Sequence, residues 1–468
     1  MSKTRLEKDS LGTKEIPENF YYGVQTLRAV ENFPISGLKS HPRFIDTFVM
    51  IKKAAAIVNA KLGSLPAKSK EAIVQACDEV LSGRLTDQFP VDVFQMGAGT
   101  AFNMNVNEVL ANRANEILGQ PKGAYKPIHP NDHVNMGQST NDTFPTGARV
   151  VFLLILKENV HEALELLEKS FVRKASEFDS VLKSGRTHLQ DAVPIRLGQE
   201  FAAYAECLKK CGQSLKQAEK GLCELGLGGS AVGTGLNTVP GYREEIIREL
   251  ATLSGLPLVP AKDMREAMQS QRPITELSAS LRNLALELTR ILNDLRLLSS
   301  GPTTGFAEIN LPATAPGSSI MPGKVNPSIL EMGNMVAFHV IGADTTVALA
   351  VQAGQLELNV MLPVMVFEIN FSMMILANAL KILSTKCVDG ITANVERCRH
   401  YAESTPGLAT ALNAFIGYEK AAEVAKEAMK NGKTIVQVIR EKKILSEEQI
   451  RQIMDPIKMT EPGIPGKI

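Results

Sequence analysis

The densest group of chemically useful side chains lies in residues 317–327, Gly-Ser-Ser-Ile-Met-Pro-Gly-Lys-Val-Asn-Pro. Pro322 and Pro327 each lack an N–H and fix φ, so a regular helix cannot continue through this segment. Its hydroxyls, its amide and the Lys324 cation suit an anion, and also a second negative charge that develops during a reaction. Taken alone, the same composition is more often that of an ordinary polar turn between helices.

Three further polar segments interrupt the predicted helices: 97–105, 138–142 and 185–191. Each can bring hydroxyls or amides to a helix end, where free N–H groups and the helix dipole favour anions. Each also has a structural alternative. Residues 139–141, Ser-Thr-Asn, are good N-cap residues, and a lone His188 is often a hydrogen-bonded structural histidine.

Together the four segments offer hydroxyls, amides, one lysine and one histidine, a set that suits a small dicarboxylate. Lys324 and helix N-termini would neutralise one carboxylate. Hydroxyl and N–H donors would stabilise the other carboxylate as it gains charge, once a proton leaves the adjacent carbon. This is β-elimination through an enediolate-like intermediate, in which each well-placed donor contributes roughly 10²–10³ in rate.

Other cofactor and metal motifs are weak or absent in the sequence. The glycine-rich run 225–235 follows a predicted helix without a surrounding βαβ unit, so it is a poor match to a dinucleotide site. The sequence has neither a Walker A motif nor a Gly-x-Ser-x-Gly elbow. Cys207 and Cys211 lie one helical turn apart, but no cluster of histidines or carboxylates completes a metal site. We therefore predict inert thiols, no metal and no cofactor.

Composition excludes several classes of protein. The 468 residues carry 51 basic and 50 acidic side chains, which argues against a nucleic-acid-binding surface, and the lack of tryptophan argues against base stacking. The first nine residues hold no apolar segment, and no unbroken apolar run reaches about 18 residues, so neither a secretory signal nor a membrane span is predicted. Six scattered cysteines are typical of a reducing compartment, and a cytoplasmic location is expected.

The middle of the chain is dominated by long helical patterns. Five are predicted, at about 148–182, 195–223, 277–298, 328–353 and 361–386. The third carries apolar residues at alternating spacings of about four and three, the heptad seam of a helical bundle: Leu277, Leu281, Leu284, Leu288, Ile291, Leu295 and Leu298. The expected domains are a mainly helical N-terminal domain (1–142), a central helical bundle (143–395) and a small helical C-terminal domain (396–468).

The motifs resemble the aspartase/fumarase superfamily over essentially the whole length. Residues 317–326 are similar to the signature loop of that family, and residues 187–192 and 97–105 are similar to its two other motif regions. The resemblance implies an all-α fold in which four chains pair their five-helix bundles into a twenty-helix core. It also implies that each active site draws on three chains of this homotetramer.

Three segments resemble the aspartase branch of the superfamily rather than the fumarases: residues 21–36, 138–141 and 353–361. The implied activity is the reversible deamination of L-aspartate to fumarate and ammonia. Fumarate hydration is the alternative, since residues 129–132, His-Pro-Asn-Asp, resemble a fumarase segment that forms a second anion site. A non-catalytic helical scaffold with the same fold is the alternative of another class.

The resemblance also implies roles for individual residues. Ser318 would be the base that removes the Cβ proton, with His188 as the second catalytic residue. The substrate-binding residues would fall into three groups: Thr187, Lys324 and Asn326 at the α-carboxylate; Ser139, Thr140 and Ser319 at the β-carboxylate; and Thr100, Asn141 and His188 at the leaving amino group.

Overall fold

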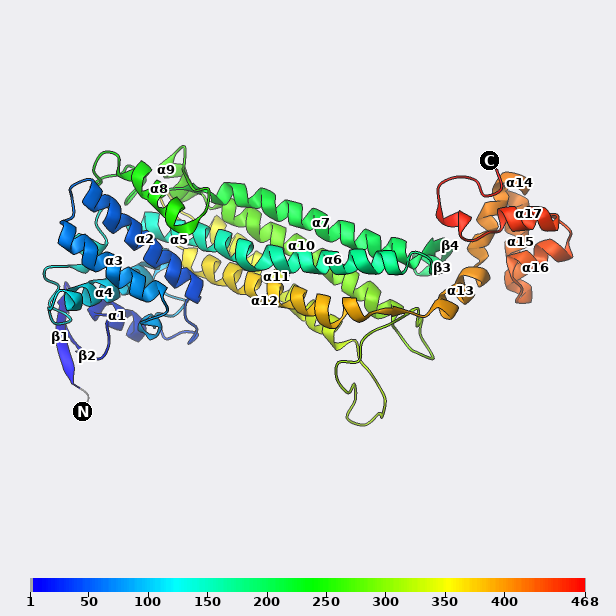
Figure 1. Cartoon of the computed structure of the whole chain (residues 1–468), viewed down its shortest axis with the longest axis horizontal. Helices are drawn as coiled ribbons and strands as arrows, with labels where there is room; N and C mark the ends of the chain where they lie inside the picture. The colour runs from blue at the N-terminus through cyan, green and yellow to red at the C-terminus, as the bar shows by residue number, and fades with distance from the viewer. Residues whose placement is uncertain (1–2, 468) are drawn as a thin grey trace. The chain divides into compact units, whose positions relative to one another are not determined.

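The computed structural model describes residues 3–467, and helices dominate it (Figure 1). Within that range the strands are short and pair into four two-stranded sheets. The predicted all-α fold is therefore confirmed, whereas the three domain ranges stay a prediction. The chain divides into two compact units. Unit 1 comprises Gln213–Asn283, Phe338–Leu376 and the described part of Met1–Glu162; unit 2 comprises Ala163–Gly212, Leu284–Ala337 and the described part of Ala377–Ile468.

Unit 1 begins with an antiparallel hairpin and continues as packed helices. Its first elements are β1 (Thr4–Asp9), β2 (Gly12–Pro17), α1 (Val24–Asn32), α2 (Pro42–Lys61), α3 (Ala67–Leu81), α4 (Thr100–Ile117), the π-helical turn η3 (Pro130–Val134) and α5 (Thr140–Ile155). Its later short elements are β5 (Glu224–Leu225), α8 (Tyr242–Ser254), β6 (Val259–Pro260) and α9 (Met264–Gln269), with β5 and β6 paired in parallel.

Four phenylalanines hold α2, α4 and α5 together. The ring centroids of Phe44, Phe48, Phe102 and Phe144 lie 5.0–6.5 Å apart, and each side chain is buried. Burial of each ring contributes roughly 1.5–3 kcal/mol. Phe102 lies in the first turn of α4 and Phe144 near the start of α5, so this cluster fixes the N-termini of both helices.

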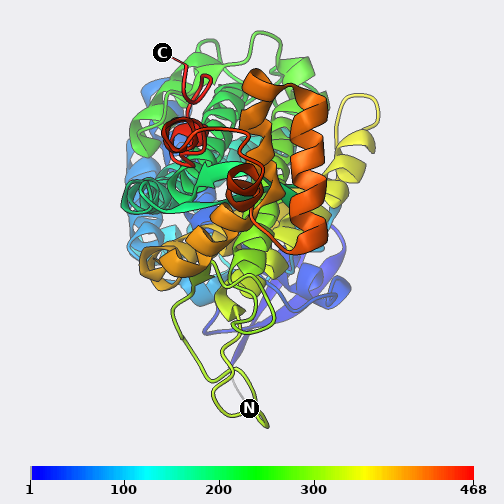
Figure 2. The ribbon, with the colours of Figure 1, turned by 90° about the vertical axis from the view of Figure 1, so that its right-hand side faces the viewer.

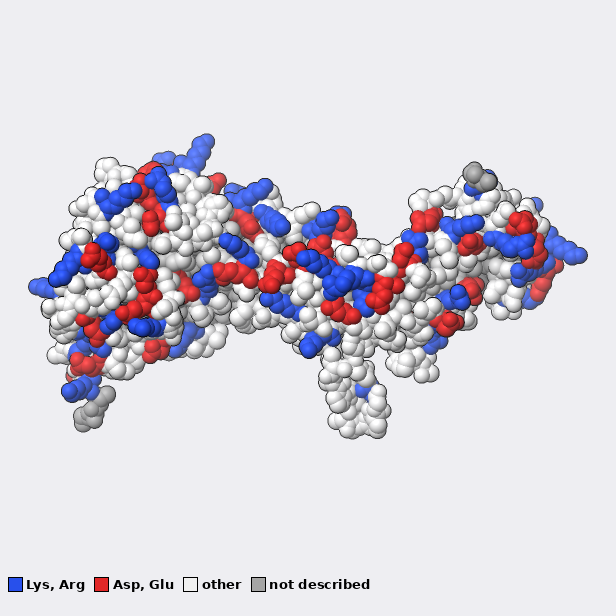
Figure 3. Space-filling view, in the orientation of Figure 1, with Lys and Arg blue, Asp and Glu red and all other residues white. Residues whose placement is uncertain are grey.

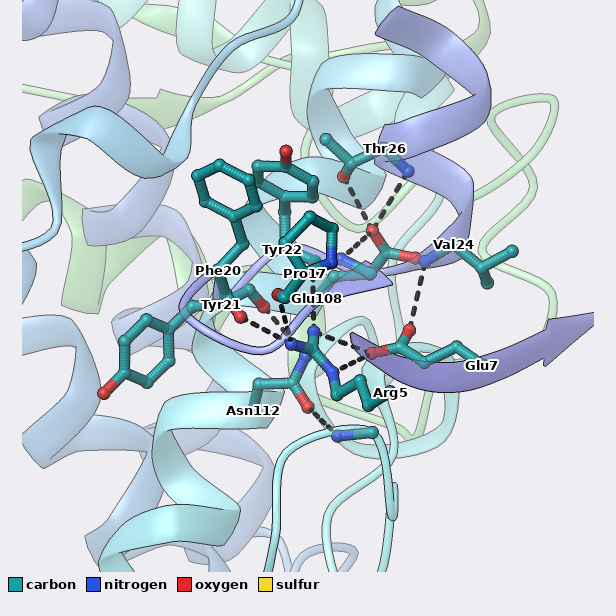
Figure 4. Close-up of polar contacts among 12 residues, drawn as sticks. Arg5, Glu7, Pro17, Phe20, Tyr21, Tyr22, Val24, Thr26, Glu108 and Asn112 are labelled. Atoms are coloured by element: carbon teal, nitrogen blue, oxygen red, sulfur yellow. Dashed lines mark hydrogen bonds and ion pairs between the residues drawn. The ribbon is translucent and has the colours of Figure 1, made fainter. Parts of the chain in front are cut away.

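Two buried carboxylates tie the start of α1 to α4 and to the hairpin (Figure 4). Glu108 of α4 accepts hydrogen bonds from four donors: the N–H groups of Gly23, Gln25 and Thr26 and the Thr26 hydroxyl. Glu7 of β1 accepts from the N–H of Val24 at 3.0 Å and from the Arg5 guanidinium at 2.8 Å. The carboxylates satisfy N–H groups that have no partner inside the helix.

The five long helices predicted from the sequence are present among the described residues. They are α6 (His161–Glu177), α7 (Leu197–Leu222), α10 (Arg272–Leu298), α11 (Ser328–Gln352) and α12 (Leu362–Lys386). The heptad seam of α10 is buried along its whole length, as predicted. The first predicted helix differs, because the π-helical turn η4 (Leu156–Val160) separates α5 from α6. In unit 2 a Cβ on Gly333 would lie 2.6 Å from Leu292, so α10 and α11 pack closely there.

The rest of unit 2 consists of short elements. The polar segment 185–191 lies within an antiparallel hairpin of β3 (Leu182–Thr187) and β4 (Gln190–Arg196). The strand β7 (Ile309–Asn310) pairs with β8 (Thr392–Ala393). The final helices are α13 (Val395–Ser404), α14 (Asn413–Ile416), α15 (Tyr418–Asn431), α16 (Ile435–Glu441) and α17 (Glu447–Ile453). Gly432 ends α15 with a φ of 63°.

Two helical stretches are long and apolar enough to cross a membrane by length and composition alone: α11 and Leu362–Gly390, which contains α12. Neither is an unbroken apolar run, because Asp344 interrupts the first and Glu368 the second. Core helices of soluble proteins pass the same test, and 61% of the apolar window of Leu362–Gly390 is buried. Only 39% of the window in α11 is buried, so this helix has a large apolar surface that its own chain leaves open.

Candidate active site

Ser139 is the N-cap of α5. Its hydroxyl accepts a hydrogen bond from the N–H of Asn141 at 3.2 Å, and the Asp142 carboxylate accepts from the N–H of Ser139 at 2.9 Å. This reciprocal pair is a capping box. The N-cap alternative is therefore confirmed for Ser139. It does not conflict with anion binding, because it places Thr140 and Asn141 in the first turn, where free N–H groups and the dipole attract negative charge.

The glycine-rich run supports this same helix end. Asp142 accepts further hydrogen bonds from the N–H groups of Gly228 at 3.0 Å and Ser230 at 2.9 Å, and the Asn141 amide donates to the Ala231 carbonyl at 2.9 Å. Gly228 has a φ of 90°, which glycine adopts without strain. Burial raises the pKa of Asp142 to about 7. The run that resembled a dinucleotide motif thus braces the start of α5, a role that the sequence analysis missed.

A buried lysine lies behind the same helix end. Lys52 of α2 is 0% exposed, and its ammonium donates to the amide oxygen of Asn103 at 2.7 Å. The Asn103 amide nitrogen in turn donates to the Thr140 hydroxyl at 2.9 Å. The sequence analysis did not single out Lys52. It did hold a signal, since Lys52 lies one turn after Phe48 on the apolar stripe of its helix.

Thr100, the first residue of α4, lies one helical turn before Asn103, whose amide contacts Thr140. It borders a cavity of about 480 Å³ together with Arg28, His129 and Asn131. Ser139, Thr140 and Asn141 do not line this cavity. His129 caps the short turn η3, where its ring accepts a hydrogen bond from the N–H of Asn131 at 3.2 Å.

Thr187 and His188 lie at the tip of the β3–β4 hairpin in unit 2. Thr187 pairs with Gln190, and the two residues between them, His188 and Leu189, have φ values of 56° and 59°. This is the backbone of a two-residue type I′ turn, which non-glycine residues adopt at a cost. Both Thr187 and His188 are exposed.

A buried ion-pair cluster holds this hairpin. The fully buried Glu308 accepts two hydrogen bonds from the Arg186 guanidinium, at 2.9 and 3.0 Å. The buried Lys183 ammonium lies 3.2 Å from the same carboxylate and 2.7 Å from that of Glu200. Paired and hydrogen-bonded buried charges of this kind fix geometry, so the strand that leads into the exposed turn is held in place.

Residues 317–327 form an irregular loop that extends away from the helices of unit 2, as the yellow-green segment before α11 in Figures 1 and 2 shows. The Ser318 hydroxyl accepts hydrogen bonds from the N–H groups of Ile320 at 3.2 Å and Met321 at 2.9 Å. The base of the loop is closed where the N–H of Gly317 donates to the Lys324 carbonyl at 2.7 Å. The Asn326 amide donates to the Gly317 carbonyl at 2.6 Å. The prediction of a shaped, non-helical loop is confirmed.

The structure therefore groups the predicted site residues into separate clusters. Ser139, Thr140 and Asn141 lie together at the start of α5. Ser318, Ser319, Lys324 and Asn326 share one loop, and Thr187 and His188 share one turn. Among residues 3–467, no hydrogen bond joins this loop to this turn. The catalytic and binding roles stay predictions.

Charge on the molecular surface is mixed rather than segregated. On the face drawn in Figure 3, basic and acidic side chains are interspersed. The loop that leads into α11 is almost uncharged, because Lys324 is the one ionisable residue between 311 and 327. An anion that reaches this loop therefore meets a single local cation and a set of neutral donors.

The sequence has close relatives along its whole length. A family model described as "Lyase" matches residues 12–342, and one described as "Fumarase C C-terminus" matches residues 408–461. The aspartate ammonia-lyase of Bacillus subtilis is 50% identical over 463 residues, which cover 99% of this chain and 97% of the relative. That of Escherichia coli is 47% identical, with coverages of 99% and 97%.

Solved structures match equally completely. The fumarate lyase:delta crystallin from Brucella melitensis bound to cobalt is 49% identical with a TM-score of 0.95, covering 98% of this chain and 100% of that one. The class II fumarase from Schistosoma mansoni is 37% identical with a TM-score of 0.95 and coverages of 98% and 99%. Backbone similarity alone therefore does not separate the two activities.

Proposed function

The chain belongs to the aspartase/fumarase superfamily and is a carbon–nitrogen lyase, and we propose that it reversibly converts L-aspartate to fumarate and ammonia. The observation that carries this proposal is identity along the whole chain. Aspartate ammonia-lyases reach 47–50%, whereas the class II fumarase reaches 37%. Substrate choice depends on individual side chains rather than on the fold, so sequence identity is the better guide here.

In this proposal the Ser318 oxyanion takes a proton from the carbon beside the β-carboxylate. The electrons of that C–H bond move into the carboxylate and give an enediolate. Their return forms the C=C bond and breaks the C–N bond, so that ammonia and fumarate are released. The two backbone N–H groups that donate to Ser318 support this role, because such donors stabilise an oxyanion.

The substrate's charged groups are assigned to the clusters described above. The start of α5, with Ser139 and Thr140, would hold the β-carboxylate together with Ser319, since this carboxylate gains charge and needs oriented donors. Thr187, Lys324 and Asn326 would hold the α-carboxylate. Thr100, Asn141 and His188 would contact the amino group. The enzyme would need no cofactor, because proton transfer and charge stabilisation suffice for this elimination.

We further propose that the active enzyme is a homotetramer whose sites combine residues from three chains. The support is the apolar surface of α11, where Met335, Phe338 and Leu349 are 65%, 57% and 58% exposed. Large exposed apolar surfaces mark association sites, and copies of the same chain are the usual partners. Light scattering coupled to size exclusion should give four times the mass of 50.8 kDa, and a stable monomer with full activity would contradict the proposal.

A cytoplasmic location is part of the same proposal. All six cysteines are free, and three of them are buried: Cys77, Cys387 and Cys398. Unpaired thiols in a chain of this size are typical of a reducing compartment. Fractionation of expressing cells would test this, with the soluble cytoplasmic fraction as the expected location.

The decisive experiment compares two substrates. Purified protein is incubated with L-aspartate and, separately, with L-malate, and fumarate is followed by its ultraviolet absorbance. Fumarate from aspartate is the expected result, with ammonia released in equal amount. Fumarate from malate alone would identify a fumarate hydratase, and inactivity towards both substrates would favour a non-catalytic scaffold.

A further inference from the structure

Lys52 is a fully buried cation whose hydrogen bonds all go to neutral amides. Its ammonium donates to the side-chain oxygens of Asn103 at 2.7 Å, Gln138 at 2.9 Å and Asn135 at 3.0 Å. In the described part of the chain, no carboxylate lies within ion-pairing distance of it. A buried cation without a contacting counter-ion costs stability. We therefore expect Lys52, which lies behind the start of α5, to have a role beyond packing.

The ammonium determines which way the neighbouring amides face. An ammonium group only donates hydrogen bonds, so each amide must turn its oxygen towards it. For Asn103 this leaves the amide nitrogen to donate to the Thr140 hydroxyl oxygen at 2.9 Å and to the Asn135 amide oxygen at 3.3 Å. The Thr140 oxygen is therefore an acceptor in this contact, and the hydroxyl proton must point elsewhere.

The other threonines of α5 show what is unusual about Thr140. Thr143 and Thr146 donate their hydroxyl protons to the carbonyls of Ser139 at 2.8 Å and Asp142 at 2.7 Å, four residues earlier. Thr140 is the first residue of the helix, so no such helical carbonyl is available to it. Within residues 3–467, its hydroxyl makes only the hydrogen bond that it accepts from Asn103. Its proton remains available to an anion.

We propose that Asn103, held in one orientation by Lys52, is a positioning residue that makes Thr140 a hydrogen-bond donor to the substrate carboxylate. The inference deepens the proposed function, since it rests on Thr140 as a carboxylate ligand. If Asn103 were turned over, its oxygen would accept the Thr140 proton. The hydroxyl would then offer only its oxygen to the negatively charged carboxylate, so binding would weaken and the enediolate would lose a donor.

The electrostatics of Lys52 agree with this arrangement. Burial lowers its pKa to about 7, while the nearby Asp142 carboxylate on α5 and the Cys77 thiol on α3 act in the opposite direction. A neutral amine has a lone pair that can accept an amide N–H, so loss of the proton would remove the strict orientation of Asn103. An anion bound at α5 favours the charged form and so preserves the orientation.

A double-mutant cycle tests the inference. In Asn103→Asp, a carboxylate of the same size still pairs with Lys52, but it must accept the Thr140 proton. Thr140→Val removes the hydroxyl at nearly constant volume. Each single variant should lower kcat/KM for L-aspartate, and also affinity for succinate measured by calorimetry, by about tenfold or more. The double variant should lose clearly less than the product of the two single losses, because the hydroxyl that Asn103 orients is already absent and only the effect of the added negative charge on anion binding remains.

Additive losses in the cycle, or an Asn103→Asp variant with wild-type kcat/KM, would overturn the inference. Lys52→Met should also lower kcat/KM. Lys53→Met is the control, because Lys53 is adjacent but pairs with Asp78 on α3. If Lys52→Met does not fold, the cycle still decides. If the wild-type chain does not convert aspartate, the proposed function fails, and succinate binding by the same four proteins tests the inference separately.

Discussion

The start of α5 and the loop 317–327 are proposed to serve one reaction, yet they are built in opposite ways. Around Thr140 the supporting side chains are buried and linked through Lys52, Asn103 and Asp142. Around Ser318 the loop is largely exposed and is held by a few hydrogen bonds at its base. The rigid part suits a carboxylate whose charge must be stabilised without rearrangement, and the lightly held part suits a base that must approach the substrate.

The largest expected effect comes from removing the base in the lightly held part. Ser318→Ala should lower kcat by about 10³-fold, since general-base catalysis contributes roughly 10²–10⁴. Steady-state kinetics with L-aspartate measures this, while circular dichroism and light scattering check fold and assembly. The side chain is small and its hydroxyl contacts only loop N–H groups, so both checks should match the wild type. A near-normal kcat would remove Ser318 from the base role.

The next largest effect comes from opening the base of the same loop. A Cβ on Gly317 would clash with the Lys324 carbonyl oxygen and lie 2.8 Å from the Asn326 nitrogen. Gly317→Ala should therefore lower kcat/KM by about 10²-fold through misplacement of Ser318. Thr314→Ala, at an exposed position just before this loop in the segment that leads into α11, is the matched control and should be near wild type. Similar losses in both variants would show that any change in the loop is harmful, rather than its closure at Gly317.

The sequence predicts much of the region around the loop 317–327, which carries the proposed base. Two prolines and two glycines within eleven residues exclude a helix at 317–327, and the heptad seam of α10 required a bundle around it. Such signals are local, because each depends on neighbouring residues or on a fixed period. The β3–β4 hairpin was missed because its strands carry charged residues such as Lys183 and Arg186, whose partners lie elsewhere in the chain.

The contacts that support the start of α5 were much harder to predict from the sequence. Asp142 and the N–H of Gly228 are separated by 86 positions, and no periodicity connects them. The glycine-rich run indicated an unusual backbone but not what that backbone would bind. Lys52 is an exception. Its position on an apolar stripe predicts burial, and a buried lysine requires buried partners. Which amides would surround it depended on how α2, α4 and α5 pack.

Replacing the Asp142 carboxylate, which holds the start of α5, should affect stability more than catalysis. In Asp142→Asn one oxygen becomes an NH₂ group, which faces N–H donors and leaves at least one of them without an acceptor. A buried unsatisfied group costs about 1–3 kcal/mol. Urea unfolding followed by circular dichroism, at fixed protein concentration, should show this loss. Asp389→Asn, which weakens a more exposed pair with Arg173, should change the unfolding free energy by less than about 0.5 kcal/mol.

An effect of similar size is a pH dependence at Glu108, the carboxylate that holds the start of α1. Burial raises its pKa from 4.5 to about 7, although hydrogen bonds from the Thr26 hydroxyl and from the N–H groups of Gln25 and Thr26 oppose this shift. Between these values the folded state binds more protons than the unfolded state, so the unfolding free energy falls as pH rises. Gln cannot ionise, and its single oxygen cannot accept on both sides of the carboxylate. Glu108→Gln should therefore be destabilising at pH 5 and less so at pH 8, by about 2 kcal/mol.

A penalty for Glu108→Gln that is the same at both pH values would mean that the four donors keep Glu108 ionised throughout. The wild-type and variant proteins are compared by urea unfolding at equal concentration, so other titrating groups cancel in the difference. That outcome would also bear on the carboxylate at the start of α5. If four donors outweigh burial at α1, the three N–H groups on Asp142 hold that carboxylate charged in the same way, and the support of α5 is then a fixed negative charge opposite Lys52.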